Sequence, residues 1–122
     1  MNAAPRTQTG RRAESLACGF LQGHGLRLLA RNYRCRCGEV DLVMSDGDTT
    51  VFVEVRYRRH AGFGSGAESV DARKRRRLTA AALHYLQRHG EAAQGPSRFD
   101  VVSMSGPPQA PGIDWIRNAF EA

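Results

Sequence analysis

The chain has 122 residues, a formal net charge of +6 at pH 7, and a hydrophobic fraction of 41%. This length is typical of one domain with a real core and is too short for two. No apolar run is long enough to span a bilayer, and the first residues lack the apolar stretch of a secretion signal. An odd number of cysteines, three, suits a reducing compartment. We therefore expect a cytoplasmic protein without a membrane partner.

The positive charge is carried almost entirely by arginine, because Lys74 is the only lysine among the 18 lysine and arginine residues. Arginine is favoured where phosphate is bound through two parallel hydrogen bonds. The basic residues cluster in three places, at residues 31–36, 56–59 and 73–77. Such clusters in a small domain favour a nucleic-acid partner, and the alternative is a solvated basic surface.

Residues 1–9 read as a flexible basic arm, because they contain Pro5 and no apolar periodicity. We expect residues 10–122 to form a single domain. Apolar residues from Ala13 to Leu21 recur at helical spacing and predict a first helix that ends at the following glycines.

The later elements follow from hydrophobic period and turn signals. In chain order we expect a strand at 26–33, a hairpin of strands 39–44 and 50–58 around Asp46-Gly47, a second and longest helix N-capped by Asp71 and ending at Gly90, a strand at 98–104, and a short strand at 113–116 before a C-terminal turn of helix. A helical crossover lets its two flanking strands run parallel, so this order predicts an α/β fold with a mixed sheet covered by helices.

The hairpin carries acidic residues in otherwise apolar strands. A loop with an even number of residues is expected, because it groups the apolar side chains on one face: Val40, Leu42, Met44, Val51, Val53 and Val55. The same register sets Asp41 across from Glu54, with Cβ atoms roughly 4.5–5.5 Å apart. Two carboxylates at that spacing favour a divalent cation, Mg²⁺ or Mn²⁺. The alternative is a salt bridge from Arg56.

Motifs along nearly the whole chain resemble a known family. They are Glu14, Gly38-Glu-Val-Asp-Leu-Val43, Val51-Phe-Val-Glu-Val-Arg-Tyr-Arg-Arg59, Lys74, Arg98-Phe-Asp-Val-Val102 and Trp115-Ile116. Together they resemble the YraN-like family of small bacterial proteins, which in turn resembles Holliday-junction resolvases of the PD-(D/E)xK nuclease superfamily. The resemblance implies a restriction-endonuclease-like core, a central mixed β-sheet flanked by helices in the order α-β-β-β-α-β.

The resemblance also implies roles for individual residues. Asp41 and Glu54 correspond to the metal ligands of the superfamily, for Mg²⁺ or Mn²⁺, and Glu14 to an acid that such resolvases add from a helix. Arg56 stands where the motif has a lysine, and it retains the ability to stabilise phosphate charge but not to exchange a proton. Lys74 on the second helix is one candidate for the missing ammonium group, and a phosphate contact is the alternative for it.

The function that the resemblance implies is metal-dependent cleavage of structured or branched DNA, with Glu14, Asp41, Glu54 and Arg56 as catalytic residues. A homodimer is expected only by analogy with resolvases. Phosphate contacts position nucleic acid without reading its sequence, and the candidates for them are Arg58, Arg59, Lys74, Arg75 and Arg77. Two alternatives stay open: a non-catalytic nucleic-acid-binding module in which Arg56 neutralises the carboxylates, and a scaffold that binds an acidic protein.

Overall fold

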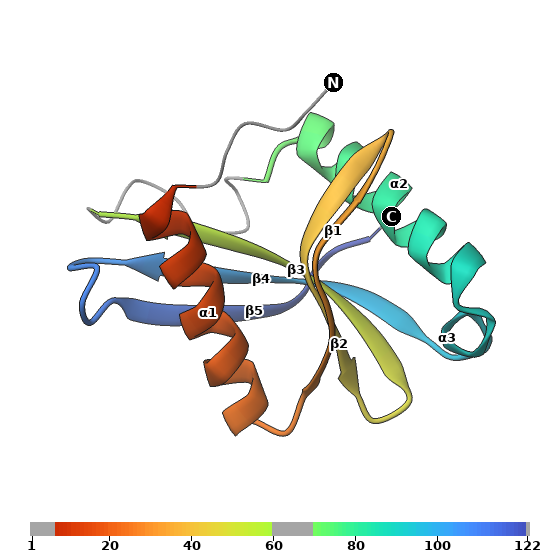
Figure 1. Cartoon of the computed structure of the whole chain (residues 1–122), viewed down its shortest axis with the longest axis horizontal. Coiled ribbons are helices and arrows are strands. Elements are labelled where there is room, and N and C mark those ends of the chain that lie inside the picture. The colour runs from red at the N-terminus through yellow and green to blue at the C-terminus, as the bar shows by residue number, and fades with distance from the viewer. Residues whose placement is uncertain (1–6, 60–69, 122) are drawn as a thin grey trace.

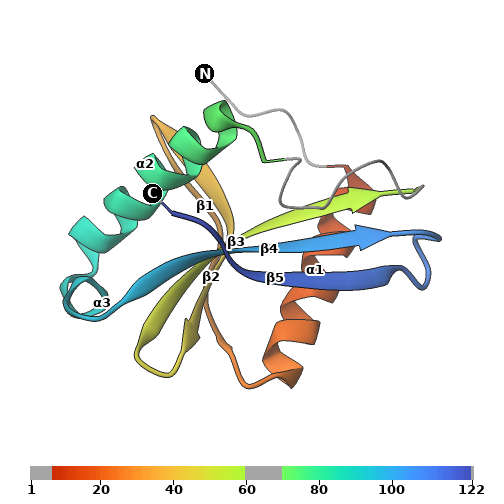
Figure 2. The same ribbon diagram turned by 180° about the vertical axis from the view of Figure 1, so that it is seen from behind.

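The structure is a computed structural model, and it describes residues 7–59 and 70–121. Five strands form one sheet in the order β1-β2-β3-β4-β5, with helices lying against it (Figures 1 and 2). The elements are α1 (Gln8–Gly23), β1 (Arg27–Cys35), β2 (Gly38–Asp46), β3 (Thr49–Arg58), α2 (Ala72–Arg88), α3 (Gly90–Gln94), β4 (Ser97–Ser105) and β5 (Gly112–Phe120). The α/β class with a mixed sheet flanked by helices is confirmed. Residues 1–6 of the predicted arm lie outside the described residues. Helix α1 begins at Gln8, which is inside the span of 1–9 predicted as the arm.

The β2–β3 hairpin has the predicted antiparallel arrangement with an even loop. The strands pair from Leu42 opposite Val53 to Asp46 opposite Thr49, which leaves a two-residue turn. Gly47 in that turn has a φ of 59°, a conformation that glycine adopts without strain. β3 and β4 run parallel and are joined through α2, so the predicted helical crossover is also confirmed.

The two long helices cover opposite faces of the sheet, as the two ribbon views show (Figures 1 and 2). The core under α1 contains Ala13, Ala17, Cys18, Leu21, Leu42, Met44, Val51, Val53, Val102 and Met104. The core under α2 contains Val40, Val43, Phe52, Leu78, Ala81, Ala82, Tyr85, Phe99, Val101 and Phe120. Neighbouring residues of β3 and β4 alternate between these cores, because successive side chains of a strand point to opposite faces.

The prediction that Val40 shares a face with Leu42 is wrong. Val40 packs in the core under α2, whereas Leu42 packs under α1. The change of face falls at Asp41, directly beyond the Leu42–Val53 pair at which the β2–β3 ladder ends. Without ladder hydrogen bonds to β3, this part of β2 is not held to the regular alternation. Asp41 therefore lies at the point where β2 leaves β3.

The predicted C-terminal turn of helix is also wrong, because β5 continues as a strand to Phe120. Asn118 has a φ of 49°, and its N–H donates to Oδ1 of the buried Asp100 at 2.9 Å. This irregularity returns the chain to the sheet, where the ring of Phe120 stacks on Phe99 with centroids 4.9 Å apart. Burial of an aromatic ring thus outweighs the local helical preference of the last residues.

Helix α2 begins as predicted, because the side chain of Asp71 caps it by accepting the Lys74 N–H at 2.9 Å. Gly38, at the start of β2, lies directly against this helix. A Cβ atom at Gly38 would be 1.8 Å from the carbonyl oxygen of Arg77, so only glycine allows the approach. The contact fixes β2 against α2 three residues from Asp41 on the strand. Among the described residues, no helix is long and apolar enough to cross a membrane.

Candidate functional site

A cavity of about 310 Å³ opens where the first turns of α1 and α2 approach β2 and β3. Its walls contain all four of the predicted catalytic residues together with the lysine of α2. The lining residues are Thr7, Thr9, Gly10, Ala13, Glu14, Asp41, Glu54, Val55, Arg56, Tyr57 and Lys74. Acidic and basic side chains from four separate elements therefore meet in one hollow.

Three carboxylates reach this cavity from different elements. Glu14 lies on the buried face of α1 and is 3% exposed, and Asp41 on β2 is 8% exposed. Oδ2 of Asp41 accepts the backbone N–H of Val55 at 2.8 Å, so the aspartate side chain links β2 to β3 beyond the end of their ladder. The ladder stops at Leu42 opposite Val53, so Asp41 and Glu54 are not a ladder pair, but their carboxyl groups still meet through a hydrogen bond.

Glu54 has a strongly perturbed environment. Burial raises its pKa from 4.5 to about 9, and the negative charge of Asp41 and a hydrogen bond between the two carboxyl groups act in the same direction. The guanidinium of Arg56 opposes this rise without cancelling it. In the metal-free protein at neutral pH, this raised pKa keeps a proton on Glu54.

Two cations approach the same oxygen of Glu54. Nη1 of Arg56 lies 3.6 Å from Glu54 Oε2, and Nζ of Lys74 lies 3.7 Å from it. The salt bridge that we weighed against a metal ion is thus present, and a second cation from α2 joins it. Both distances are long for a charge-assisted hydrogen bond, so the contacts are electrostatic and leave the geometry adjustable.

Asp41 and Glu54 are suited to hold a hard divalent cation, because such ions are bound by one or two carboxylates and complete their shells with water and phosphate. The raised pKa of Glu54 is compatible with this fit, since burial and the charge of Asp41 keep the proton bound and a cation between the two groups would offset both effects. Within residues 7–59 and 70–121, no three His, Cys, Asp or Glu side chains are grouped as a ready-made metal cage. The donor set is therefore a carboxylate pair, and Glu14 lines the same cavity without completing such a cage.

The predicted phosphate contacts are only partly gathered at the cavity. Lys74 lines it, whereas Arg58, Arg59 and Arg77 are exposed and lie outside its walls. Arg75 points elsewhere: its Nε donates to the carbonyl of Val70 at 3.0 Å, and its guanidinium lies over the ring of Phe120. The phosphate contacts of these residues stay predictions.

The first turn of α1 was not expected to form part of the site. Thr7 caps this helix by accepting the N–H of Gly10 at 2.9 Å, and both residues line the cavity with Thr9. The first turn carries no acidic residue, so the positive end of the helix dipole faces the hollow without an internal counter-charge. A threonine just before the apolar periodicity was the available signal, but it fell in the segment that we read as a flexible arm.

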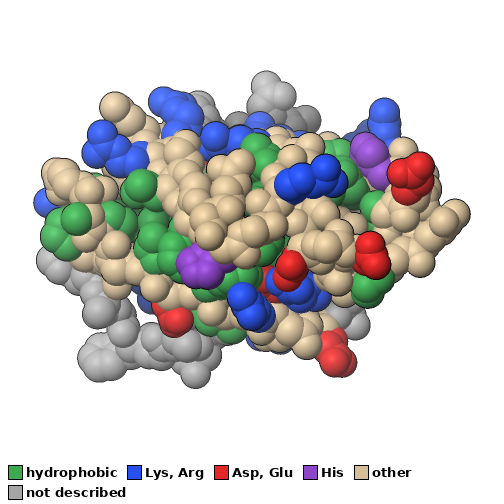
Figure 3. All heavy atoms as spheres, turned by 90° about the horizontal axis from the view of Figure 1, so that it is seen from below, with side chains coloured by type: hydrophobic (Ala, Val, Ile, Leu, Met, Phe, Trp, Pro, Cys, Tyr) green, Lys and Arg blue, Asp and Glu red, His purple; other side chains and the backbone are tan. Residues whose placement is uncertain are grey.

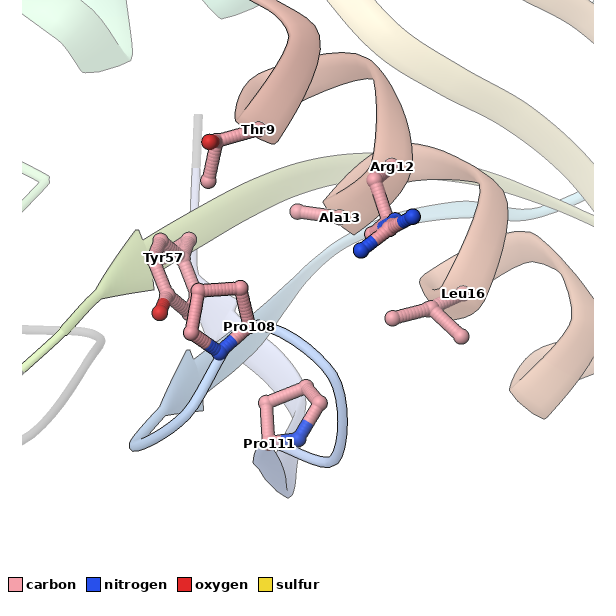
Figure 4. A pocket seen from close by; sticks show the side chains of 7 residues that line it. All are labelled: Thr9, Arg12, Ala13, Leu16, Tyr57, Pro108 and Pro111. Atoms are coloured by element: carbon pink, nitrogen blue, oxygen red, sulfur yellow. The ribbon is translucent and has the colours of Figure 1, made fainter.

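Two other hollows have no comparable chemistry. The gap between α1 and the β4–β5 turn has a volume of about 10 Å³, and Tyr57, Pro108 and Pro111 line it opposite Ala13 and Leu16 (Figure 4). This gap has room for about one water molecule. A wider hollow of about 540 Å³ lies between residues 34–37 and the outer side of α2, and none of its lining residues is acidic. Neither hollow offers carboxylates to a divalent cation.

The end of the molecule away from the helix N-termini has a mixed surface. Figure 3 shows this end from below, with hydrophobic, basic and acidic side chains interspersed. Acidic side chains lie beside some of the cations on this face, so it is not a uniform basic patch.

The comparisons with known proteins identify the family. The model of the uncharacterised protein family UPF0102 matches residues 13–104, which include the acidic residues of the cavity as well as Arg56 and Lys74. A UPF0102 protein of Stutzerimonas stutzeri is 59% identical over 114 residues, which cover 93% of this chain and 95% of the relative. UPF0102 proteins of Pseudomonas putida and Nitrosococcus oceani are 53% and 51% identical, and each match covers at least 97% of both chains. The chain therefore belongs to the uncharacterised protein family UPF0102.

Proposed function

We propose that this protein is a divalent-metal-dependent endonuclease that acts on structured or branched DNA, in the manner of Holliday-junction resolvases. The observation that carries the proposal is the pairing of Asp41 and Glu54 in a cavity that also holds Arg56 and Lys74. Acidic ligands for a cation and basic groups for a phosphate are thus 3.6–3.7 Å apart at Glu54. Phosphoryl transfer requires this combination, because charge must be stabilised on the transferred group while the attacking water is activated.

The roles of the residues follow from their positions. Asp41 and Glu54 would hold Mg²⁺ or Mn²⁺, which would lower the pKa of bound water and neutralise charge on the phosphate. Arg56 remains protonated and stabilises the charge that develops on the phosphate oxygens. Glu14 faces the cavity from α1 and orients water by hydrogen bonding. The positive end of α1 lies at the same wall and favours an anionic substrate.

The preference for structured DNA rests on the resemblance and on the distribution of positive charge. Arginines are exposed beyond the cavity at the end of β3 and along the first turns of α2, so they would contact phosphates on either side of the cleaved bond. Contacts of this kind position a nucleic acid by the shape of its backbone rather than by its bases. The surface is therefore better suited to distinguish a junction from a linear duplex than to recognise a base sequence.

A second candidate function is a nucleic-acid-binding module without catalysis. It is favoured by the two cations at Glu54 Oε2, because a carboxyl group already in contact with Arg56 and Lys74 does not require a metal ion. The two candidates make opposite predictions for metal titration. A nuclease binds Mn²⁺ through Asp41 and loses this binding in Asp41→Asn, whereas the module binds DNA equally well with or without metal.

The deciding experiment incubates the purified protein with labelled four-way junctions, flaps, linear duplex and single strands in Mg²⁺ or Mn²⁺. Glu54→Gln is the matched control, because glutamine has nearly the shape of the protonated carboxyl group present in the metal-free protein. Cleavage by the wild type and its loss in the variant would support the nuclease. Tight DNA binding by both proteins without cleavage would refute it and favour the module.

A further inference from the structure

Lys74 has a position that no arginine of its helix shares. Its side chain is 42% exposed, and Nζ lies 3.7 Å from Glu54 Oε2, so the ammonium group contacts the carboxylate while still reaching open solvent. Among the residues of α2, Lys74 alone lines the cavity. It is also the only lysine in the chain, so chemistry directed at a lysine side chain acts on this residue alone.

The backbone at Lys74 is held firmly. Its N–H is bonded to the Asp71 side chain at 2.9 Å, which fixes the first turn of α2. One helical turn later, the carbonyl of Arg77 lies against Gly38 at the start of β2. The root of the side chain is therefore fixed relative to the strand that carries Asp41. The side chain itself has a flexible four-carbon stem, so the ammonium group can move while the helix stays in place.

A divalent cation at the carboxylate pair would change the electrostatics of both neighbouring basic groups. Arg56 and Lys74 approach one oxygen of Glu54, and each would then face a cation with two positive charges at close range. Arg56 lies two residues from Glu54 on the same strand, and its side chain is only 23% exposed. Lys74 has more freedom, so it is the group that would leave Glu54.

We propose that Lys74 is a catalytic residue of this site that exchanges its partner during the reaction. Its ammonium group lies beside Glu54 in the metal-free protein, and it would bind a non-bridging oxygen of the scissile phosphate once a divalent cation occupies the place beside Glu54. The inference rests on the nuclease function proposed above. The compact positive charge of an ammonium group then comes from Lys74 on α2, because Arg56 on β3 has a guanidinium group instead.

The exchange predicts effects of opposite sign in one variant. Lys74→Met removes a cation from the metal side of Glu54, so Mn²⁺ without DNA should bind about two- to fivefold more tightly, as measured by calorimetry. The same variant lacks the phosphate contact, so single-turnover cleavage of saturating junction DNA should slow roughly 100-fold. Arg73→Met is the control, because it removes an equal charge from the neighbouring residue, which does not line the cavity. Its Mn²⁺ affinity should match that of the wild type. Loss of a purely structural contact would not tighten metal binding.

Acetylation of the single lysine gives an independent measurement. Reaction with N-hydroxysuccinimidyl acetate, followed by peptide mass spectrometry, separates Lys74 from the N-terminal amine. Ca²⁺ alone should speed the acetylation of Lys74, because the ammonium group leaves Glu54. Ca²⁺ together with a four-way junction should protect it, because the phosphate then covers the group. Slower acetylation with Ca²⁺ alone would contradict the exchange.

The outcomes separate this inference from the proposed function. If the wild type binds no Mn²⁺ and cleaves nothing, both proposals are wrong. If the wild type binds metal and cleaves, but Lys74→Met binds Mn²⁺ no more tightly than Arg73→Met, the exchange is wrong and the nuclease stands. Tighter metal binding with an unchanged cleavage rate would also overturn the inference, because Lys74 would then not act on the phosphate.

Discussion

Replacing Glu54 with glutamine should stabilise the metal-free protein at neutral and alkaline pH. The pKa of Glu54 is raised from 4.5 to about 9 in the folded protein, chiefly by burial and by Asp41. An unfolded chain has its ordinary pKa, so between these two values the unfolded state loses the proton first. The free energy of unfolding therefore falls as the pH rises from about 4.5 to 9, and glutamine, which has no charge, abolishes this fall.

The magnitude follows from the size of the pKa shift. Each pH unit within this window costs about 1.4 kcal/mol, so the wild type loses about 3 kcal/mol between pH 4.5 and 7 through this one group. The variant replaces the protonated carboxyl group by an amide, and a less favourable hydrogen bond to Asp41 would offset about 1 kcal/mol of this gain. A net gain of about 2 kcal/mol at pH 7 corresponds to a rise in Tm of roughly 5–10 °C for a domain of this size.

The assay is thermal unfolding of both proteins in EDTA, at pH values from 4 to 9. The two melting temperatures should coincide near pH 4, and the difference should grow steadily toward pH 8. Glu91→Gln, which changes an exposed carboxylate on α3, controls for the loss of one negative charge and should show no such growth. If Glu54→Gln is no more stable than the wild type at pH 8, the carboxylate does not hold a proton in the folded protein and the reasoning is refuted.

Three further predictions concern the metal and the supports of the site. Mn²⁺ binding at pH 7 should release about one proton, because Glu54 must ionise to become a ligand. Calorimetry in buffers of different ionisation enthalpy measures the number of protons released, and a value of zero would contradict the prediction. Gly38→Ala should cost at least about 2 kcal/mol in urea unfolding, because its Cβ would lie 1.8 Å from the Arg77 carbonyl oxygen. Gly19→Ala, at an exposed and open position in α1, is the control and should be neutral or stabilising. Asp100→Asn should cost about 3–5 kcal/mol, because it removes the charge from a buried ion pair, and an unchanged urea midpoint would contradict this role.

Features of the fold that depend on local chemistry could be predicted from the sequence. The hairpin register follows from the turn at Asp46-Gly47 and from alternation, and both act over a few residues. The N-cap at Asp71 has the same origin, because its side chain bonds to an N–H three residues away. Features that depend on packing could not be predicted. Val40 changes face where β2 leaves β3, and Phe120 stays in the sheet because Phe99 lies beside it.

The same distinction holds within the candidate site. The proximity of the Asp41 and Glu54 carboxyl groups was predicted because both residues belong to one hairpin, although the strand pairing itself ends at Leu42 and Val53. The approach of Lys74 to Glu54 depends on where α2 packs, and that position is set by the contact at Gly38. The motif residue Gly38 is therefore required by a helix that lies far away in the sequence. Sequence reasoning placed Lys74 on the correct helix but left its contact with the carboxylate open.

Two buried carboxylates of this fold show how a structural acid differs from a candidate ligand. Asp100 is 1% exposed, yet it accepts hydrogen bonds from Arg98, from Nε1 of Trp115 and from a backbone N–H, so its charge is balanced within the chain. Glu54 has two cations at more than 3.5 Å and a second carboxyl group beside it, and its pKa rises to about 9. The chain therefore stabilises the charge of Asp100 and leaves the charge of Glu54 uncompensated. A carboxylate that ionises only when further positive charge arrives is suited to bind a metal ion, and this contrast is why we place the proposed metal site at Glu54 rather than at Asp100.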